Sequence, residues 1–201
     1  STYFCHNKNL YKNILSKVYK YYMKILAVQS RMGIGDTVIF LPFIKALSKK
    51  FNSPISILVK ENSKANQYLH QTKYIDKILI LERDNKTNNR HGGFFGIFKL
   101  ANDLKKYKFD KIFIFNSSLR FNLVAKISGI PKIYQYPLFT KNKQHLIETP
   151  KKFLKENLHM DINEDPEVQI ESDLISKAAQ KFQIDKNTTN ILLGIGGSGP
   201  T

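Results

Sequence analysis

Residues 24–51 read KILAVQSRMGIGDTVIFLPFIKALSKKF, and this stretch decides the fold. The apolar run ILAVQ at 25–29 is typical of a buried strand, and residues 37–51 repeat apolar side chains at helical spacing. A strand therefore passes into a helix through RMGIGDT, residues 31–37, which holds two glycines and one aspartate. This order is the opening unit of a sheet whose strands alternate with helices.

The same alternation continues along the chain. Short apolar runs predict strands, and the longer periodic segments between them predict helices. The predicted strands are residues 25–29, 55–59, 77–81, 111–115 and 190–195, and the predicted helices are residues 37–51, 63–71, 94–107, 120–129, 145–158 and 172–183. Most of these strands are too apolar for a sheet with one wet face, so we expect an α/β domain with a Rossmann-like parallel sheet and helices on both faces.

The composition narrows the class of protein. The chain has 32 Lys and Arg against 16 Asp and Glu, a formal net charge of +16, which favours phosphates, acidic glycans, anionic lipids or nucleic acid as partners. Most aromatic side chains lie inside apolar periodic runs rather than in an exposed stripe, which disfavours nucleic acid. The single cysteine, Cys5, excludes an intrachain disulfide and favours a cytoplasmic protein. No apolar run approaches the roughly 18 to 20 residues of a membrane-spanning helix.

Residues 1–22 form a basic extension before the first strand. Leu10, Ile14 and Val18 recur at helical spacing, with lysines largely away from them, which predicts a short amphipathic helix. Such a helix can anchor a protein to a membrane surface or pack on its own domain, and the sequence favours neither. We expect three parts: this extension, a domain over residues 23–185, and an interdomain segment with one strand of a further domain over residues 186–201.

The glycine loops match no nucleotide-binding motif. A dinucleotide fingerprint needs a third glycine where Val38 stands, and a phosphate-binding P-loop needs a lysine where GIGGSGPT, residues 194–201, has Pro200. What remains of the first loop is Asp36, at or near the N-terminus of a helix. An N-cap aspartate is worth about 1 kcal/mol, which explains the residue without catalysis, and position alone favours this interpretation.

Four segments together resemble one family. They are MKILAVQSRMGIGDTVIFLPFIKAL (23–47), FDKIFIFNSSLRFNLVAKISGIPKIY (109–134), HLIETPKKFL (145–154) and NILLGIGGSGPT (190–201). Their order and spacing are similar to those of family 9 glycosyltransferases, the bacterial ADP-heptose:lipopolysaccharide heptosyltransferases. The resemblance implies the N-terminal half of a GT-B glycosyltransferase, in which two Rossmann-like domains face a cleft and the N-terminal one binds the acceptor.

The resemblance also implies roles for single residues. Asp36 would be the catalytic base that takes the proton of the acceptor hydroxyl in an inverting transfer. Gly33 and Gly35 would let the acceptor approach the backbone closely. Arg120 could bind an acidic acceptor, and a solvated arginine at a helix start is an equally good interpretation. Arg83 and Arg90 could add to this acceptor-binding set, although a mobile surface loop is the favoured interpretation for them. Ser198 and Thr201 could bind the donor phosphates. His91 could join the arginines of the loop ERDNKTNNRHGG, and a structural role is expected for His145. The reaction would need no metal and no cofactor, because a helix N-terminus and lysine can neutralise the leaving diphosphate.

Two functions from different classes follow. The first is an inverting glycosyltransferase that moves a sugar, heptose by the resemblance, from a donor such as ADP-heptose to an acidic lipid-linked glycan of the lipopolysaccharide core. It would work in the cytoplasm, peripherally on the inner membrane. The alternative is a non-catalytic module that binds RNA or an anionic membrane surface. Because the donor domain would follow Thr201, we expect no transfer by residues 1–201 alone.

Overall fold

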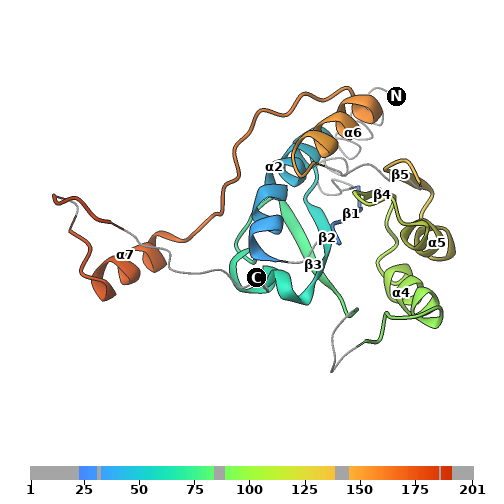
Figure 1. Ribbon diagram of the computed structural model, residues 1–201, viewed down its shortest axis with the longest axis horizontal. Helices are drawn as coiled ribbons and strands as arrows, with labels where there is room; N and C mark the ends of the chain where they lie inside the picture. Colours follow the sequence, from blue (N-terminus) through green and yellow to red (C-terminus); the bar gives the residue numbers. More distant parts are fainter. Residues whose placement is uncertain (1–22, 31–32, 84–88, 139–144, 186, 192–201) are drawn as a thin grey trace, which may run out of the picture. The chain divides into compact units, whose positions relative to one another are not determined.

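The computed structural model describes residues 23–30, 33–83, 89–138, 145–185 and 187–191. The chain divides into two compact units, residues 1–168 and residues 169–201 (Figure 1). The first unit contains the whole sheet, and the second contains helix α7 (Ser172–Lys181). The domain boundary expected at residue 185 stays a prediction.

The first unit is built on one five-stranded sheet in which every neighbouring pair is parallel. Its strands are β1 (Ile25–Val28), β2 (Ile55–Lys60), β3 (Ile75–Leu81), β4 (Lys111–Ile114) and β5 (Lys132–Gln135), in the order β3-β2-β1-β4-β5. The central strand β1 is fully buried, as its apolar sequence requires. This arrangement confirms the predicted Rossmann-like α/β fold.

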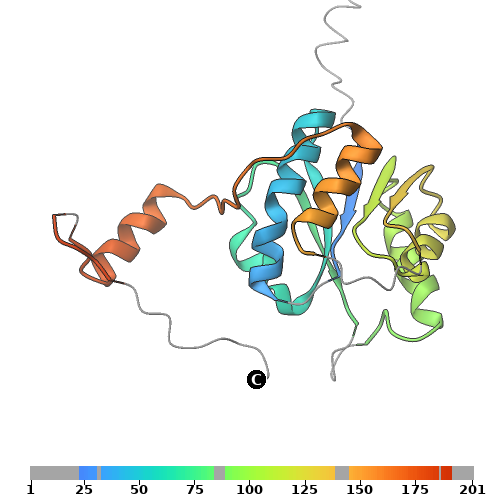
Figure 2. The same ribbon diagram turned by 45° about the horizontal axis from the view of Figure 1, so that its top comes forward.

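Helices cover both faces of the sheet (Figure 2). One face is covered by α2 (Ile34–Phe51), α3 (Ala65–Tyr68) and α6 (Glu148–Leu158), with a short 3-10 helix η1 (Glu61–Ser63), and the other by α4 (Phe95–Lys105) and α5 (Leu119–Ile127). The side chains of β1 alternate between the two cores: Ile25 and Ala27 belong to the first, and Leu26 and Val28 to the second. Both faces of β1 are therefore dry.

The segment after α6 returns across α2 and completes the first core. Ile162 is buried there, and the Lys45 ammonium lies 3.2 Å from the Glu167 carboxylate. Glu164 accepts a hydrogen bond from Lys49, which lowers the pKa of that carboxyl below its ordinary value. These contacts join residues more than a hundred positions apart, and they fix the C-terminal half of α2 against the rest of the unit.

The structure departs from the predicted elements in four places. Strand β5 was not predicted, and α2 begins at Ile34 rather than at residue 37. The helix expected over residues 63–71 is divided into η1 and α3, because Lys64 adopts a left-handed conformation with φ 52°. The predicted strand at 190–195 has no strand structure at residues 190–191, and its other residues lie outside the described part of the chain, as does the extension 1–22.

Candidate functional site

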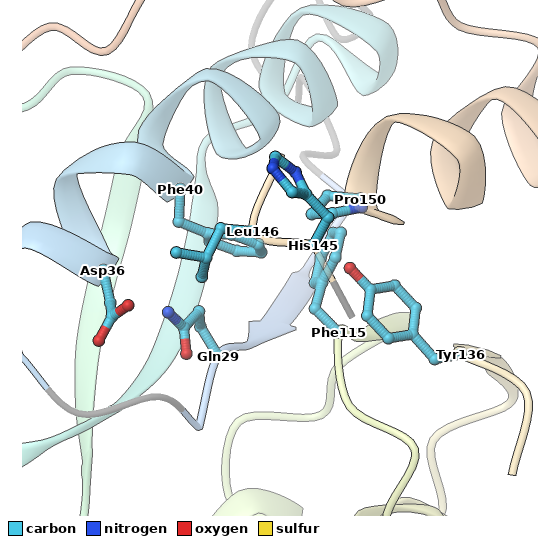
Figure 3. A pocket seen from close by; sticks show the side chains of 8 residues that line it. All are labelled: Gln29, Asp36, Phe40, Phe115, Tyr136, His145, Leu146 and Pro150. Atoms are coloured by element: carbon cyan, nitrogen blue, oxygen red, sulfur yellow. The ribbon is translucent and has the colours of Figure 1, made fainter. Parts of the chain in front are cut away.

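A small pocket with a cavity volume of about 20 Å³ lies where β1 and β4 are side by side (Figure 3). Gln29, Phe115 and Tyr136 line it, and each follows directly after a strand: β1, β4 and β5, respectively. Asp36 and Phe40 of α2 line its helical side. The chain leaves β1 toward β2 and leaves β4 toward β5, so the pocket lies at the topological switch point. Ligands of open α/β sheets bind at this place.

The floor of the pocket is a cluster of aromatic rings. Phe40 packs edge-on against Phe115 with ring centroids 4.5 Å apart. Phe115 and Tyr136 both make similar edge-to-face contacts with Phe153 of α6, at 5.2 and 5.0 Å. Such pairs are worth about 0.5–1.5 kcal/mol each beyond the burial of their area. The pocket therefore has a rigid apolar wall that is continuous with the core.

Asp36 is the one carboxylate among the residues that line this pocket. The prediction that it is an N-cap is wrong, because Gly33 is the N-cap residue and Asp36 is the third residue of α2. Its side chain is half-buried, and no hydrogen bond or ion pair from the described residues reaches it. Asp36 therefore presents a hydrogen-bond acceptor to the pocket.

The two glycines before Asp36 differ in whether their backbone conformation requires glycine. Gly33 has φ 121° and ψ 156°, a conformation essentially restricted to glycine, and a Cβ there would lie 3.4 Å from the Asp36 carboxylate. Gly35 has an ordinary φ, and a Cβ added to it would meet no atom within 4 Å. Gly33 is required by the turn itself. Gly35 is not required by its backbone conformation or by close packing.

The third wall comes from the segment that enters α6: His145, Leu146 and Pro150. The backbone N–H groups of Ile147 and Glu148 donate to the His145 Nδ1, at 3.3 and 3.2 Å. The neutral ring therefore carries its proton on Nε2, because Nδ1 must be unprotonated to accept these bonds. The ring satisfies two N–H groups at the start of α6, which supports the structural role expected from the sequence.

A network of polar side chains holds together the carboxyl ends of β1, β4 and β5 beside the pocket. Asn116, directly after Phe115, donates to the Ser30 hydroxyl at 2.6 Å and accepts from the Ser118 N–H at 2.6 Å. Gln135 donates to the carbonyls of Asn116 and Ser118, both at 2.9 Å, and accepts from Asn122. The turn after β4 is thereby joined to both neighbouring strands. Sequence reasoning missed this network, although each of its strand residues stands at or just past a strand end.

Arg120 lies outside the pocket and holds a loop. Its guanidinium donates to the carbonyls of His91 and Gly93, the latter at 2.7 Å. A Cβ on Gly96 would lie 2.9 Å from the same guanidinium and 2.3 Å from the His91 carbonyl, so the absence of a side chain there allows the close packing. These contacts give Arg120 a structural role, and its predicted contact with the acceptor stays a prediction.

Arg90 and His91 also have hydrogen-bond and ion-pair partners within the chain. The Arg90 guanidinium lies 2.8 Å from the Asp103 carboxylate, and the His91 Nε2 lies 3.1 Å from it. His91 also exchanges two hydrogen bonds with the backbone of Glu82: its N–H donates to the Glu82 carbonyl, and its Nδ1 accepts from the Glu82 N–H. Burial raises the pKa of Asp103, but the hydrogen bonds from His91 and Arg90 lower it by more, so its net pKa is below the ordinary value.

The structure does not bring all the predicted site residues together. Gly33, Gly35 and Asp36 share the first turn of α2, whereas Arg90 and Arg120 lie on the α4 side of the sheet. Arg83 begins the segment between β3 and α4, with its N–H donating to the Leu81 carbonyl. Ser198 and Thr201 lie outside the described residues. The roles of all these residues stay predictions.

The described residues contain no group of three or more His, Cys, Asp and Glu that could hold a metal ion. They also contain no helix long and apolar enough to cross a membrane. Independence from metals remains a prediction from the sequence.

No protein-family model and no curated protein matches the sequence. Solved structures do resemble it. One is the glycosyl transferase family 9 from Veillonella parvula DSM 2008, with a TM-score of 0.67 and 18% identity over 89% of this chain and 55% of that one. Another is E. coli ADP-heptose lps heptosyltransferase II, with a TM-score of 0.51 and 16% identity over 82% of this chain and 52% of that one.

The chain thus spans about half the length of each of these two proteins. At such low identity the likeness concerns the fold, and the resemblance expected from the sequence is confirmed at that level. The chain has the Rossmann-like α/β fold found in glycosyltransferases of family 9 and of the GT-B class.

Proposed function

We propose that this chain is the acceptor-binding half of an inverting glycosyltransferase and that Asp36 is its catalytic base. The observation that carries the proposal is the position of Asp36: its carboxylate lies at the switch-point pocket without a partner among the described residues. In an inverting transfer, one carboxylate accepts the proton of the acceptor hydroxyl while that oxygen attacks the anomeric carbon from the face opposite the leaving group.

The surroundings of Asp36 suit a sugar acceptor. The carboxylate is half-buried at the pocket, and the aromatic floor excludes water from one side of it. The turn formed by Gly33 fixes the first turn of α2 and with it the direction of the carboxylate. Preorganisation of this kind lowers the cost of aligning nucleophile and base.

The donor would bind on a second domain, across a cleft from the acceptor-binding one. The likeness to an ADP-heptose heptosyltransferase favours a nucleotide-diphosphate sugar such as ADP-heptose as donor and a lipopolysaccharide-core glycan as acceptor. Ser198 and Thr201 would contribute to the binding of the donor diphosphate. Residues 1–201 without such a domain would bind acceptor but transfer nothing.

The test is Asp36→Asn in the full-length protein, assayed for transfer from ADP-heptose to a core acceptor. Loss of a general base lowers kcat by about 10²–10⁴, whereas KM for the donor should stay unchanged because Asp36 lies on the acceptor side. Glu61→Gln is a matched control, since this exposed carboxylate lies outside the pocket residues. A kcat of Asp36→Asn within twofold of the wild type contradicts the assignment.

The alternative of an anion-binding module makes a different prediction for the same residue. Asp36 places negative charge at the pocket, so an anion would bind more tightly to Asp36→Asn than to the wild type. Weaker binding of a neutral oligosaccharide to the variant would instead favour the glycan site. Isothermal titration with inorganic phosphate and with a neutral core oligosaccharide separates the two.

A further inference from the structure

The outer surface of α4 and α5 carries an unusual number of exposed apolar side chains. Phe94 and Phe95 are 69% and 76% exposed, and Phe98 is 48% exposed. Three aliphatic residues of α5 are also exposed: Leu119, Leu123 and Ile127. These six residues are called the α4–α5 face below. A fold that needed only a soluble helical layer would place polar residues at these positions.

The two parts of the face lie on neighbouring helices. The ring of Phe94 contacts those of Phe95 and Phe98, with centroids 6.0 and 5.6 Å apart. Helices α4 and α5 lie side by side, and Arg120 at the start of α5 bonds to the Gly93 carbonyl at the start of α4 (Figure 1). Leu119, Leu123 and Ile127 recur every four residues, so they form a stripe along α5.

The charges around the face are almost all positive. Lys99, Lys105 and Lys106 are exposed on or beside α4, and Lys126 is exposed on α5. The acid of α4 is Asp103, whose carboxylate is held by Arg90 and His91, and the sequence of α5 contains no acid. An apolar centre with a basic rim matches a bilayer that offers both acyl chains and anionic headgroups. A second copy of the chain would bring two basic rims together, which disfavours a symmetric dimer.

We propose that the α4–α5 face docks on an anionic lipid bilayer, with Phe94, Phe95 and Phe98 inserted at the level of the headgroups. The chain enters α4 and α5 after it leaves the carboxyl ends of β3 and β4, so the aromatic end of the face lies toward the sheet edge that carries the Asp36 pocket. A lipid-linked acceptor held in the same bilayer could then reach that pocket. This last use of the face rests on the proposed function, whereas bilayer binding itself does not.

The first experiment places a reporter in the face. The chain contains no tryptophan, so Phe95→Trp gives a single emitter. With vesicles of phosphatidylethanolamine and phosphatidylglycerol we expect a blue-shifted emission that brominated acyl chains quench. Phe182→Trp, at a residue 68% exposed in the second unit, is the matched control and should not shift. Emission of Phe95→Trp that stays unshifted with vesicles, or that shifts with protein concentration in their absence, overturns the proposal.

The second experiment removes the aromatic centre. We expect the triple variant Phe94→Ser, Phe95→Ser, Phe98→Ser to partition into the same vesicles at least tenfold less than the wild type, and Phe182→Ser to partition as the wild type does. Circular dichroism checks that the triple variant is folded, and the Trp reporter decides the question if it is not. Unchanged partition of a folded triple variant would show that other residues, such as 1–22, carry the binding.

A last variant separates this proposal from the enzymatic one. Asp36→Asn should bind vesicles like the wild type, because Asp36 lies outside the face. Loss of transfer with retained vesicle binding supports both proposals. Transfer from Asp36→Asn together with normal vesicle binding contradicts only the catalytic one, and vesicle binding that survives in the triple variant contradicts only docking.

Discussion

Two regions of the same sheet edge use polar residues in opposite ways. Beside β3 and α4, the charged side chains of Arg90, Asp103 and Arg120 bind one another, His91 or backbone carbonyls. Beside β1 and β4, Asp36 faces a pocket with no partner among the described residues. The first region holds its loop in place, and the second leaves a carboxylate available to a ligand.

The comparison teaches which charged residues to suspect of function. Arginine after a strand suggested anion binding, but in the folded chain the Arg120 guanidinium donates to two carbonyls of the loop before α4. Aspartate after a strand suggested an N-cap, but in the folded chain its carboxylate caps nothing. In the sequence, Arg120 and Asp36 look alike, because each is a charged residue shortly after a strand. The two residues can be distinguished only by the hydrogen bonds that each side chain makes in the folded chain.

The largest effect on stability should come from Arg120→Ala. Hydrogen bonds to a charged donor contribute about 1.5–3 kcal/mol each, so loss of two bonds should lower the free energy of unfolding by about 3 kcal/mol. Urea denaturation measures this. Arg90→Ala is the matched control: its ion pair with Asp103 is half-exposed, and a cost below about 1 kcal/mol is expected. Equal costs for the two arginines would contradict the distinction between an arginine that anchors a loop and one in a surface ion pair.

Gly33→Ala and Gly35→Ala should change the free energy of unfolding in opposite directions. Alanine at Gly33 must adopt the glycine-restricted conformation, at a cost of about 1–3 kcal/mol. Alanine at Gly35 meets open space inside a helix and should stabilise the chain by about 0.5–1 kcal/mol. Thermal denaturation of both variants gives the comparison. If Gly35→Ala also weakens binding of a lipopolysaccharide-core oligosaccharide, the ligand approaches the backbone at Gly35.

The smallest expected effect is on the stability of the fold at acid pH. The folded-state pKa of Asp103 is below its ordinary value of 3.8, so the ionised form is favoured by folding. Its contribution is fully present above pH of about 4 and is lost as the pH falls through the lower folded-state value. Asp103→Asn should therefore flatten the fall of Tm between neutral and acid pH. An unchanged slope would mean that the carboxylate does not hold Arg90 and His91 in solution.

Most of the sheet could be predicted because its strands are continuous apolar runs. The exception is β5, where KIYQ is only half-buried and lies at the edge of the sheet, so it lacks such a run. The start of α2 was placed too late because glycines were read as a turn, whereas Gly35 continues the helix that Gly33 begins. The break at Lys64 follows from a left-handed residue that no local signal marks.

The site could be predicted only in part. Asp36 followed from its place between a strand and a helix and from the family resemblance, and the structure puts it at a pocket. Gln29 was assigned to a strand, and Tyr136 follows the strand that was missed, so neither could be recognised. Phe40 carries the periodicity of a core residue, and nothing local distinguishes a core ring from one that also lines a pocket.

The aromatic floor of the pocket belongs to the same cluster that holds α6 against the sheet. Occupancy and folding are therefore thermodynamically linked: a sugar that binds the native pocket and not the unfolded chain adds RT ln(1 + [L]/Kd), about 2.7 kcal/mol at a hundredfold excess over Kd. A melting-temperature screen of oligosaccharides on these 201 residues alone can thus identify the acceptor without any donor or turnover.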